Sequence, residues 1–336
     1  MEQEVKRRRP WRRWVVLAVM IVGFILAGIF APVQPEITVA PERLLEEPII
    51  ENFLGLGPLY LVNTMTTLIV TILLILVLAY FTRRSLKRSA ETDLVPRGLG
   101  NLMESFFELI YNLTEGSAGA KWVKVIFPWF ATIMFYVLFA NLLKLIPGFE
   151  SIGVLHHAHG EGNQIQELGT FLGREWALLT PEEVEEGGYI LAPFFRGVSV
   201  DLNFTAALAL ISVVMIQVIG FRAQRFRYFG KFLNVRRMFK VPFFGAMDFI
   251  VGLLELISEL AKVISFTFRL FFNMFAGIIL VAVAAFLLGK FTILTSMLYL
   301  FELFVGVIQA FVFGMLTMVF MAQATQGHGE EHAEAH

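Results

Sequence analysis

The chain has 336 residues, of which 57% are hydrophobic and only 16% are charged, and its net charge is −1. An average globular protein is about 45–50% apolar and about 25% charged, so this composition excludes an ordinary water-soluble domain. The chain has no cysteine, which excludes disulfides, thiolate metal sites and cysteine catalysis.

Apolar residues gather into long runs, and a run of about 18 or more predicts a transmembrane helix. The first run, 14–31, follows the basic stretch KRRRPWRR. This pattern also describes a cleaved signal peptide, although GIFAPV lacks a clean small-x-small cleavage site. Both readings fit, and we favour an uncleaved signal anchor, so that 1–57 holds an N-terminal helix and an exposed external segment.

The second run, 59–81, ends at the basic stretch TRRSLKR. The next stretch, VPRGLGNLMESFFELIYNLTEG, has apolar residues at helical spacing among polar ones. This pattern predicts an amphipathic helix lying along the membrane interface. The third span, 122–146, ends at Pro147-Gly148 and leads into a polar, acidic stretch, 148–201, which we expect to be a long external loop.

The fourth span, 202–221, leads into a stretch with seven Lys or Arg and no acid, 222–240. Two very long apolar segments follow, at 244–288 and 291–324, and a polar tail occupies 326–336. As helices these segments would be roughly 60 and 50 Å long, against a hydrocarbon core of about 30 Å. Either each is broken into pieces, or the pair forms a steeply tilted hairpin.

Lys- and Arg-rich short loops stay in the cytoplasm, so the basic clusters at 6–13, 83–88 and 222–240 should share one side. The acidic loop at 148–201 should lie on the other side. Six spans satisfy these assignments, with both termini in the cytoplasm. We therefore predict an all-α polytopic membrane protein with about six membrane helices, the last two forming the tilted hairpin, plus the interfacial amphipathic helix.

Arg269 lies deep inside the first of the two long segments, among Phe268, Leu270 and Phe271. A charged side chain at the bilayer centre costs about 2.5–3.5 kcal/mol on insertion scales, so such residues usually mark ion paths or counter-charges. Snorkelling to a membrane surface could explain Lys262 but not Arg269, which is too far from either end.

Successive residues of a helix turn by about 100°, which places Glu255, Lys262, Arg269 and Asn273 within an arc of about 80°. Polar residues aligned in this way indicate the wall of a hydrated path. Glu259 lies off this stripe, and a simple charge at the cytoplasmic end of the helix explains it equally well.

Glu302 and Gln309 are seven residues apart and share a face of the last helix. A carboxyl group among apolar neighbours can exchange protons near neutral pH, which suits Glu302 to a proton path. Gln309 fits such a path too, although a plain interhelical hydrogen bond is a serious alternative.

Arg269 suits a different task, because its guanidinium stays protonated and cannot relay a proton. A fixed positive charge blocks cation passage along a pore and favours ionisation of a nearby carboxylate. The pattern therefore suggests a partner that carries a carboxyl group past Arg269. The alternative is a secondary transporter or channel that uses Arg269 as an anion-binding or gating charge, but the internal repeat that many transporters show is missing.

Other site types find little support. Histidines occur in the external loop and in the tail, where a metal site is conceivable but the spacing fits only loosely; they are His156, His157 and His159 with Glu161, and His328, His332 and His336. No phosphate-binding glycine motif is present, and topology explains the basic stretch at 222–240. We expect no metal, no cofactor and no nucleic acid.

The stretches FRLFFNMFAG and IQAFVFGMLTMVFMAQA resemble the two signature helices of subunit a of the F-type ATP synthase. The resemblance continues upstream, in the family's order, through VPRGLGNLMESFFELIYNL, FANLLKLIPG, VSVDLNFTAALAL and LLELISELAKVISF, and covers about residues 58–325. It implies a membrane stator that provides two proton half-channels beside a ring of c subunits. Such a stator couples proton flow to rotation and ATP synthesis without binding nucleotide or acting as an enzyme on its own.

The resemblance also implies roles for individual residues. Arg269 would be the stator charge that faces the rotor carboxylate. The proton path from outside would use Asn273, Glu302 and Gln309, and the cytoplasmic path would use Glu255 with Ser258.

Two positions depart from the family pattern. Many members have glycine where Phe272 stands, which bears on local packing. Some bacterial members pair Glu and His at the positions of Ile278 and Glu302; because Ile278 cannot titrate, Glu302 would act without that partner.

The implied partners are the c-subunit ring, b-type peripheral stalk subunits and the rest of the ATP synthase, in a bacterial plasma membrane. The implied ion is H⁺, with Na⁺ the less favoured alternative.

Overall fold

The computed structural model of the chain describes residues 40–326 together with residues 14, 18 and 21. Within 40–326, the residues left out are 46, 53–54, 56, 93–97, 147, 159–161, 172–173, 185–186, 226–227, 229, 231–241 and 289–291. Most of the predicted first span, the basic cluster at 6–13 and nearly all of the tail therefore lie outside the described residues, as do most of the basic residues at 222–240.

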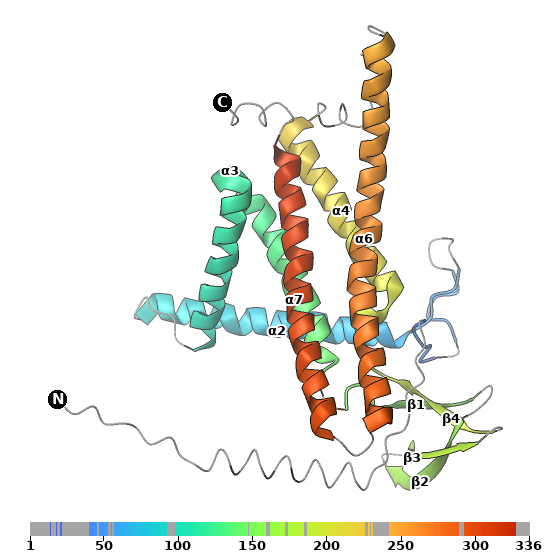
Figure 1. Cartoon of the computed structure of the whole chain (residues 1–336). Helices are drawn as coiled ribbons and strands as arrows, with labels where there is room; N and C mark the ends of the chain where they lie inside the picture. Colours follow the sequence, from blue (N-terminus) through green and yellow to red (C-terminus); the bar gives the residue numbers. More distant parts are fainter. Residues whose placement is uncertain are drawn as a thin grey trace. The chain divides into compact units, whose positions relative to one another are not determined.

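The described elements are long helices and a small sheet (Figure 1). They are α2 (Asn63–Thr92), α3 (Leu99–Leu143), β1 (Gly153–His157), β2 (Gly162–Phe171), β3 (Arg174–Val184), β4 (Tyr189–Pro193), the 3-10 helix η1 (Val198–Val200), α4 (Leu202–Gln224), α6 (Pro242–Leu288) and α7 (Thr292–Thr325).

The chain divides into two compact units, and α6 and α7 run through both. We call the first the helix unit; it comprises Thr38–Gly153, Pro193–Ala276 and Leu303–His336. The second is the sheet unit, which comprises Met1–Ile37, Val154–Ala192 and Gly277–Glu302. The sheet unit thus contains the end of the hairpin at which α6 connects to α7.

Among the described residues, five helices are long and apolar enough to cross a membrane: α2, α3, α4, α6 and α7. The chain is therefore a multi-pass helical membrane protein, as its composition predicts. These helices include the second to sixth predicted spans, and the first predicted span lies outside the described residues. α2 begins at Asn63, slightly later than predicted, and continues through the basic cluster at 83–88.

α6 has 47 residues and α7 has 34, and both are continuous helices. Continuity excludes the alternative in which each long apolar segment is broken into pieces. At 1.5 Å per residue the helices are roughly 70 and 50 Å long, longer than the hydrocarbon core is thick. Their steep tilt in the bilayer stays a prediction that follows from this length.

α3 consists of two helical limbs that meet at Gly119, where the backbone angles are φ 73° and ψ 163°. This region of φ/ψ space is essentially open only to glycine, so Gly119 permits the sharp turn. The limbs pack side by side in antiparallel order, and ring contacts join Phe106 to Phe135 and Tyr111 to Phe127 (Figure 1). The predicted amphipathic helix is the first limb; its inner face packs on the second limb, and its outer face exposes Leu102 and Leu109.

The core of the helix unit lies where α3, α4 and α7 meet. It is built from fully buried apolar side chains of all three helices. They include Phe130 and Met134 from α3, Ile216 and Ile219 from α4, and Met318 and Met321 from α7. This core fixes α7, and α7 in turn positions α6.

In the helix unit, α6 and α7 run antiparallel and touch through aromatic side chains. The Phe266 ring lies 5.1 Å from the Phe313 ring and 5.9 Å from the Phe320 ring, measured between centroids. Phe266 and Phe313 are among the largest fully buried side chains. These contacts set the register in which polar residues of the two helices meet.

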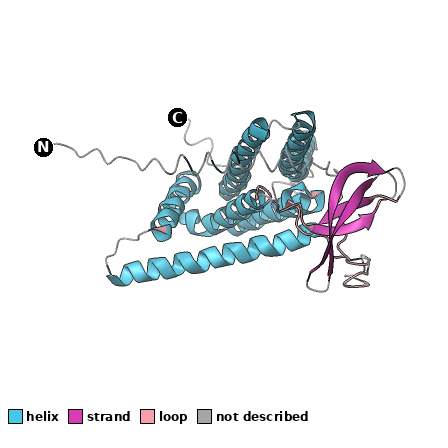
Figure 2. Ribbon diagram, turned by 90° about the horizontal axis from the view of Figure 1, so that it is seen from below, coloured by secondary structure: helices cyan, strands magenta, loops and turns pink. Residues whose placement is uncertain are grey.

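The external loop predicted at 148–201 contains a four-stranded sheet with the strand order β1-β4-β2-β3 (Figure 2). β2 and β3 pair antiparallel, from Gly162 opposite Val184 to Phe171 opposite Arg174, with two register shifts. The sequence did not predict this sheet, because β2 and β3 are rich in polar residues, β1 and β4 have only five residues each, and the four carry little apolar alternation. The all-helical expectation holds for the spans that cross the membrane.

The start of α4 is joined to α2 through Asp201. One carboxylate oxygen accepts a hydrogen bond from the Asn203 backbone N–H at 2.9 Å, which caps α4. The other oxygen accepts from the Thr64 hydroxyl at 2.8 Å. Asp201 is therefore a structural residue that ties the start of α4 to the start of α2.

Candidate functional site

Arg269 has an exposed side chain on α6, within the helix unit. Its Nη2 donates to the Ser265 hydroxyl at 3.2 Å, and its guanidinium carbon lies 6.0 Å from the centroid of the Phe266 ring. Among the described residues, no carboxylate forms an ion pair with it. A fixed positive charge thus stands on the outer surface of a membrane helix with only a hydroxyl and a ring for support.

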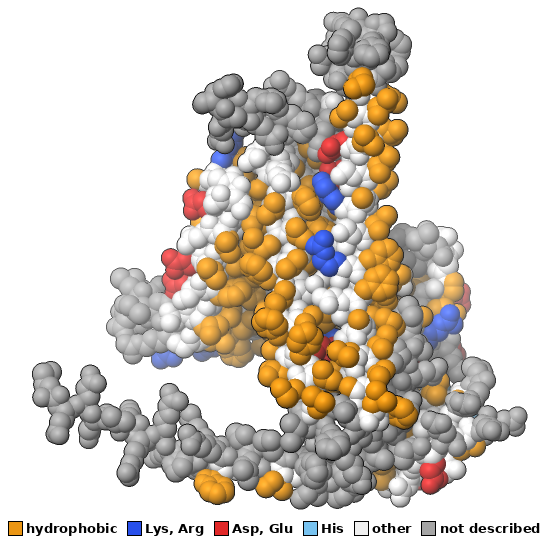
Figure 3. Space-filling view, viewed as in Figure 1, with side chains coloured by type: hydrophobic (Ala, Val, Ile, Leu, Met, Phe, Trp, Pro, Cys, Tyr) orange, Lys and Arg blue, Asp and Glu red, His pale blue; other side chains and the backbone are white. Residues whose placement is uncertain are grey.

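The surface around Arg269 is apolar. Phe268 is 42% exposed and Phe272 is 56% exposed, and their rings stack at 5.2 Å. Figure 3 shows that hydrophobic side chains cover much of the visible surface of α6, with charged side chains among them. The Phe272 side chain is directed outward, so its bulk fills no interior space.

Asn273 and Gln309 come together from α6 and α7. The Asn273 side-chain amide donates to Gln309 Oε1 at 3.0 Å. Gln309 is only 4% exposed, and its Nε2 is a buried donor without a hydrogen-bond partner among the described residues. The interhelical hydrogen bond considered as the alternative for Gln309 therefore exists, and it leaves one donor of the same side chain unused.

Glu302 lies in the sheet unit and is 6% exposed. It packs on Gly277: a Cβ atom added to this glycine would stand 2.8 Å from Glu302 Oε1. Ile278, the next residue, is half-buried. The glycine at the end of FRLFFNMFAG thus provides the space that the Glu302 carboxyl group occupies.

Glu255 and Ser258, the two residues predicted for the cytoplasmic path, lie nearer the start of α6. Glu255 is half-buried and Ser258 is exposed. They are three residues apart, so they lie on neighbouring positions of the helix surface.

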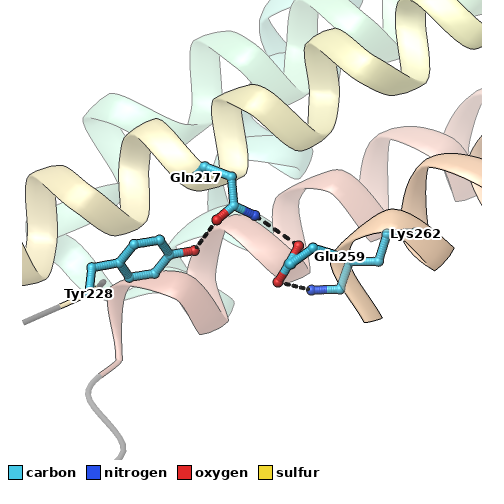
Figure 4. A network of polar contacts seen from close by, with 4 residues as sticks. All are labelled: Gln217, Tyr228, Glu259 and Lys262. Carbon is cyan, nitrogen blue, oxygen red and sulfur yellow. Dashed lines mark hydrogen bonds and ion pairs between the residues drawn. The ribbon is translucent and has the colours of Figure 1, made fainter. Parts of the chain in front are cut away.

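A hydrogen-bonded group near these residues was not predicted. Glu259, which the sequence left open between a role and a simple end charge, is 6% exposed and bonded to Gln217 and Lys262. Gln217 also accepts a hydrogen bond from the Tyr228 hydroxyl (Figure 4). Gln217, Tyr228 and Glu259 belong to three different parts of the chain. Helical spacing along α6 could have predicted only the contact between Glu259 and Lys262.

Tyr228 is 3% exposed and follows the end of α4. Burial raises the pKa of this phenol, and the charges of Glu259 and Glu255 raise it further. Tyr228 therefore keeps its proton and acts as a hydrogen-bond donor at all physiological pH values.

The histidines of the external loop show no metal-site geometry among the residues that the structure describes. The His157 ring lies against the Tyr189 ring, with 4.5 Å between centroids and 37° between the ring planes. No group of three His, Cys, Asp or Glu that could hold a metal ion occurs in the described part of the chain. His159, Glu161 and the three histidines of the tail lie outside it.

Comparison with known proteins gives a consistent result. The family model described as "ATP synthase A chain" matches residues 64–322. The chain is 30% identical to the ATP synthase subunit a of Campylobacter concisus (strain 13826) over 268 residues, which cover 77% of this chain and 88% of the relative. It is also 30% identical to the ATP synthase subunit a of Gloeobacter violaceus over 278 residues, which cover 82% and 89%.

A third relative is named for a different ion. The "ATP synthase subunit a, sodium ion specific" of Propionigenium modestum is 30% identical over 237 residues, which cover 68% of this chain and 64% of the relative.

Proposed function

Because the chain belongs to the ATP synthase A chain family, we propose that it is the stator of a rotary ion motor, with Arg269 facing a carboxylate that each rotor subunit carries past it. The family makes the chain a membrane subunit of ATP synthase that binds no nucleotide itself. The proposal names the residues that transfer the ion, the partner subunits and the ion itself.

One observation carries the proposal: Arg269 is an exposed, permanently charged side chain on an apolar membrane helix. Exposure of this charge to lipid costs several kcal/mol, so a partner with an opposite charge is favoured at this surface. A rotor carboxylate meets that requirement only while it is ionised. Arg269 would therefore favour proton release from the rotor and block a direct proton leak between the two sides.

The path from outside would use Asn273, Gln309 and Glu302. The buried Gln309 Nε2 is a donor ready for a water molecule or for the carboxyl group of a rotor subunit. The Asn273 hydrogen bond fixes the orientation of the Gln309 amide, so this donor has a defined direction. Glu302, held in the space beside Gly277, supplies a carboxyl group that can take up and pass on a proton.

The path to the cytoplasm would use Glu255 with Ser258. These residues lie on α6 near the end that connects to the basic stretch at 222–240, the side that the positive-inside rule assigns to the cytoplasm. Protons would enter from outside, travel on the rotor and leave past Glu255. The same rule supports a cytoplasmic position for both termini.

The proposed partners are a ring of small c subunits, b-type peripheral stalk subunits and the remainder of the ATP synthase, in a bacterial plasma membrane. Two relatives from bacteria at 30% identity support this setting. We propose H⁺ as the ion. The relative named as sodium ion specific makes Na⁺ the alternative that a measurement has to exclude.

The proposal is tested by Arg269→Ala in membrane vesicles that carry the whole complex. ATP-driven acidification, followed with a pH-sensitive dye, is expected to fall to the background level because the rotor carboxylate loses its counter-charge. Ile264→Ala is the matched control: it shortens another exposed side chain of α6, 57% exposed, and should leave pumping within about twofold. Normal pumping by Arg269→Ala would refute the proposal. Repeating the parent measurement with and without Na⁺ separates the two ions.

A further inference from the structure

Four side chains form one connected group between α4, the segment after it and α6, all within the helix unit (Figure 4). The Tyr228 hydroxyl donates to Gln217 Oε1 at 2.7 Å. Gln217 Nε2 donates to Glu259 Oε2 at 2.8 Å, and Lys262 Nζ donates to Glu259 Oε1 at 2.8 Å. Each hydrogen bond points toward Glu259.

Both oxygens of the Glu259 side chain accept hydrogen bonds. Each of its two carboxylate oxygens accepts from a nitrogen that can only donate, an amide NH₂ group and an ammonium group. Neither of these two partners can accept a proton from the carboxyl group. This set of partners therefore suits a fixed counter-charge better than a group that takes up and releases protons.

Tyr228 fixes the direction of this arrangement. Because its hydroxyl occupies Gln217 Oε1, the Gln217 amide must present its NH₂ group to Glu259. The Tyr228 ring lies directly on the backbone of Gly220, where any side chain would collide with it. The chain after α4 therefore takes part in holding Glu259 on α6.

Lys262 is the cation that forms an ion pair with Glu259. Its side chain is 20% exposed, and its Nζ lies 4.7 Å from the centroid of the Phe320 ring on α7. Lys262 is seven residues from both Glu255 and Arg269, so the three charges follow one face of α6 with about 10 Å of helix axis between neighbours. An ammonium group without a counter-charge would stand directly beside the proposed cytoplasmic path.

We propose that Glu259 is a fixed counter-charge that neutralises Lys262 and holds it against Phe320, so that Arg269 is left as the uncompensated cation of this face among the residues that the structure describes. Glu259 is then a positioning residue and not a member of the proton relay. This inference rests on the proposed function, because the path past Glu255 is part of that proposal. A lone charge about 10 Å from a passing cation changes its occupancy by about tenfold at an effective dielectric constant near 20.

The test compares Glu259→Gln, Lys262→Gln and the double variant, each in the whole complex in vesicles, by ATP-driven acidification. Glu259→Gln leaves Lys262 uncompensated and is expected to pump about five- to tenfold more slowly. Lys262→Gln and the double variant both remove the cation, so the two should pump within about twofold of each other and faster than Glu259→Gln. Co-purification of the other subunits shows that each variant assembles.

Three outcomes overturn the inference. Glu259→Gln pumping as fast as Lys262→Gln would mean that the uncompensated ammonium group does not disturb the path. A double variant as slow as Glu259→Gln would mean that Glu259 itself is needed, as a relay or as a structural support. A double variant at least fivefold slower than Lys262→Gln would mean the same, and this comparison decides the question even where Glu259→Gln alone fails to assemble. Arg269→Ala, measured in the same vesicles, tests the stator role separately, so failure of one proposal is distinguishable from failure of the other.

Discussion

Arg269 and Lys262 are two cations on one face of α6 with opposite surroundings. Lys262 has a carboxylate at 2.8 Å and a ring of α7 beside it, whereas Arg269 has a hydroxyl at 3.2 Å and exposed phenylalanines. The difference supports the proposal that Lys262 is a structural part of the subunit and that Arg269 acts on a partner. The sign of a charged side chain and its position within an apolar segment are therefore not sufficient to assign a role to that residue.

At the same scale, Gly277 controls the position of Glu302. In Gly277→Ala the new methyl group would stand 2.8 Å from Glu302 Oε1, and the flexible side chain can move away with little cost in stability. We expect normal assembly but roughly tenfold slower proton pumping, because a displacement of about 1 Å at a reacting group can cost that much or more. The measurement is ATP-driven acidification in vesicles.

The control for this variant is Ala276→Ser, a similar small increase in size at the neighbouring exposed position. Adding Glu302→Asp to Gly277→Ala shortens the acidic side chain and should recover part of the rate. Unchanged pumping by Gly277→Ala would show that proton entry does not depend on the carboxyl group being held at this glycine.

At the scale of elements, α3 depends on a single backbone position. Gly119 adopts φ 73° and ψ 163°, whereas Gly116, one turn earlier on the same limb, is exposed and has open space around it. Gly119→Ala is expected to lower the free energy of unfolding by about 1–3 kcal/mol. Gly116→Ala is the matched control and should raise it by up to about 1 kcal/mol, since alanine favours the helix.

This pair of variants is compared through the midpoint of thermal unfolding of the purified chain in detergent. Equal effects of the two substitutions would mean that the turn between the limbs does not need the conformation that only glycine adopts freely.

The elements differed in how far the sequence could predict them. The spans were predictable because apolar runs of membrane length rarely occur outside membrane helices, and α2, α4, α6 and α7 are found where those runs lie. The turn at Gly119 was not predicted, because one glycine in a helical pattern gives no direction to the chain that follows it. The sheet at 153–193 was not predicted either, because its strands are short or rich in polar residues and show no clear period.

For the site, helical spacing was sufficient within one element and insufficient between elements. It placed Arg269 and Asn273 on one face of α6, and the register of α6 against α7 then brings Asn273 to Gln309. Nothing in the spacing could show that Tyr228 and Gln217 reach Glu259, because Gln217 is 11 positions from Tyr228 and 42 positions from Glu259 along the chain. The helix contacts that bring them together arise only in the packed structure.

At the scale of the whole molecule, the orientation in the membrane is a prediction that the composition of the chain makes easy to test. The chain contains no cysteine, so a single introduced thiol is a unique label. Arg84→Cys lies in the basic part of α2 and Glu167→Cys lies in β2, and both positions are exposed. The positive-inside rule predicts that a membrane-impermeant maleimide labels position 167 from outside and position 84 from the cytoplasmic side only.

Intact cells and inverted vesicles give the two measurements. The cysteine-free parent is the control for reaction with other proteins. Labelling of both positions from the same side would contradict the predicted topology and, with it, the assignment of the two ion paths to opposite sides.

The bond from Gln217 to Glu259 also has a mechanical consequence. In the proposed motor, α6 would bear a lateral force each time a rotor subunit moves past Arg269. Apolar contacts between helices have no directional bonds that oppose such a movement. The 2.8 Å hydrogen bond to a carboxylate joins α6 to α4, and α4 is packed through Ile216 and Ile219 into the core shared with α3 and α7. In the proposed motor this bond would act as a cross-brace, through which force on α6 passes into the core that α3, α4 and α7 share.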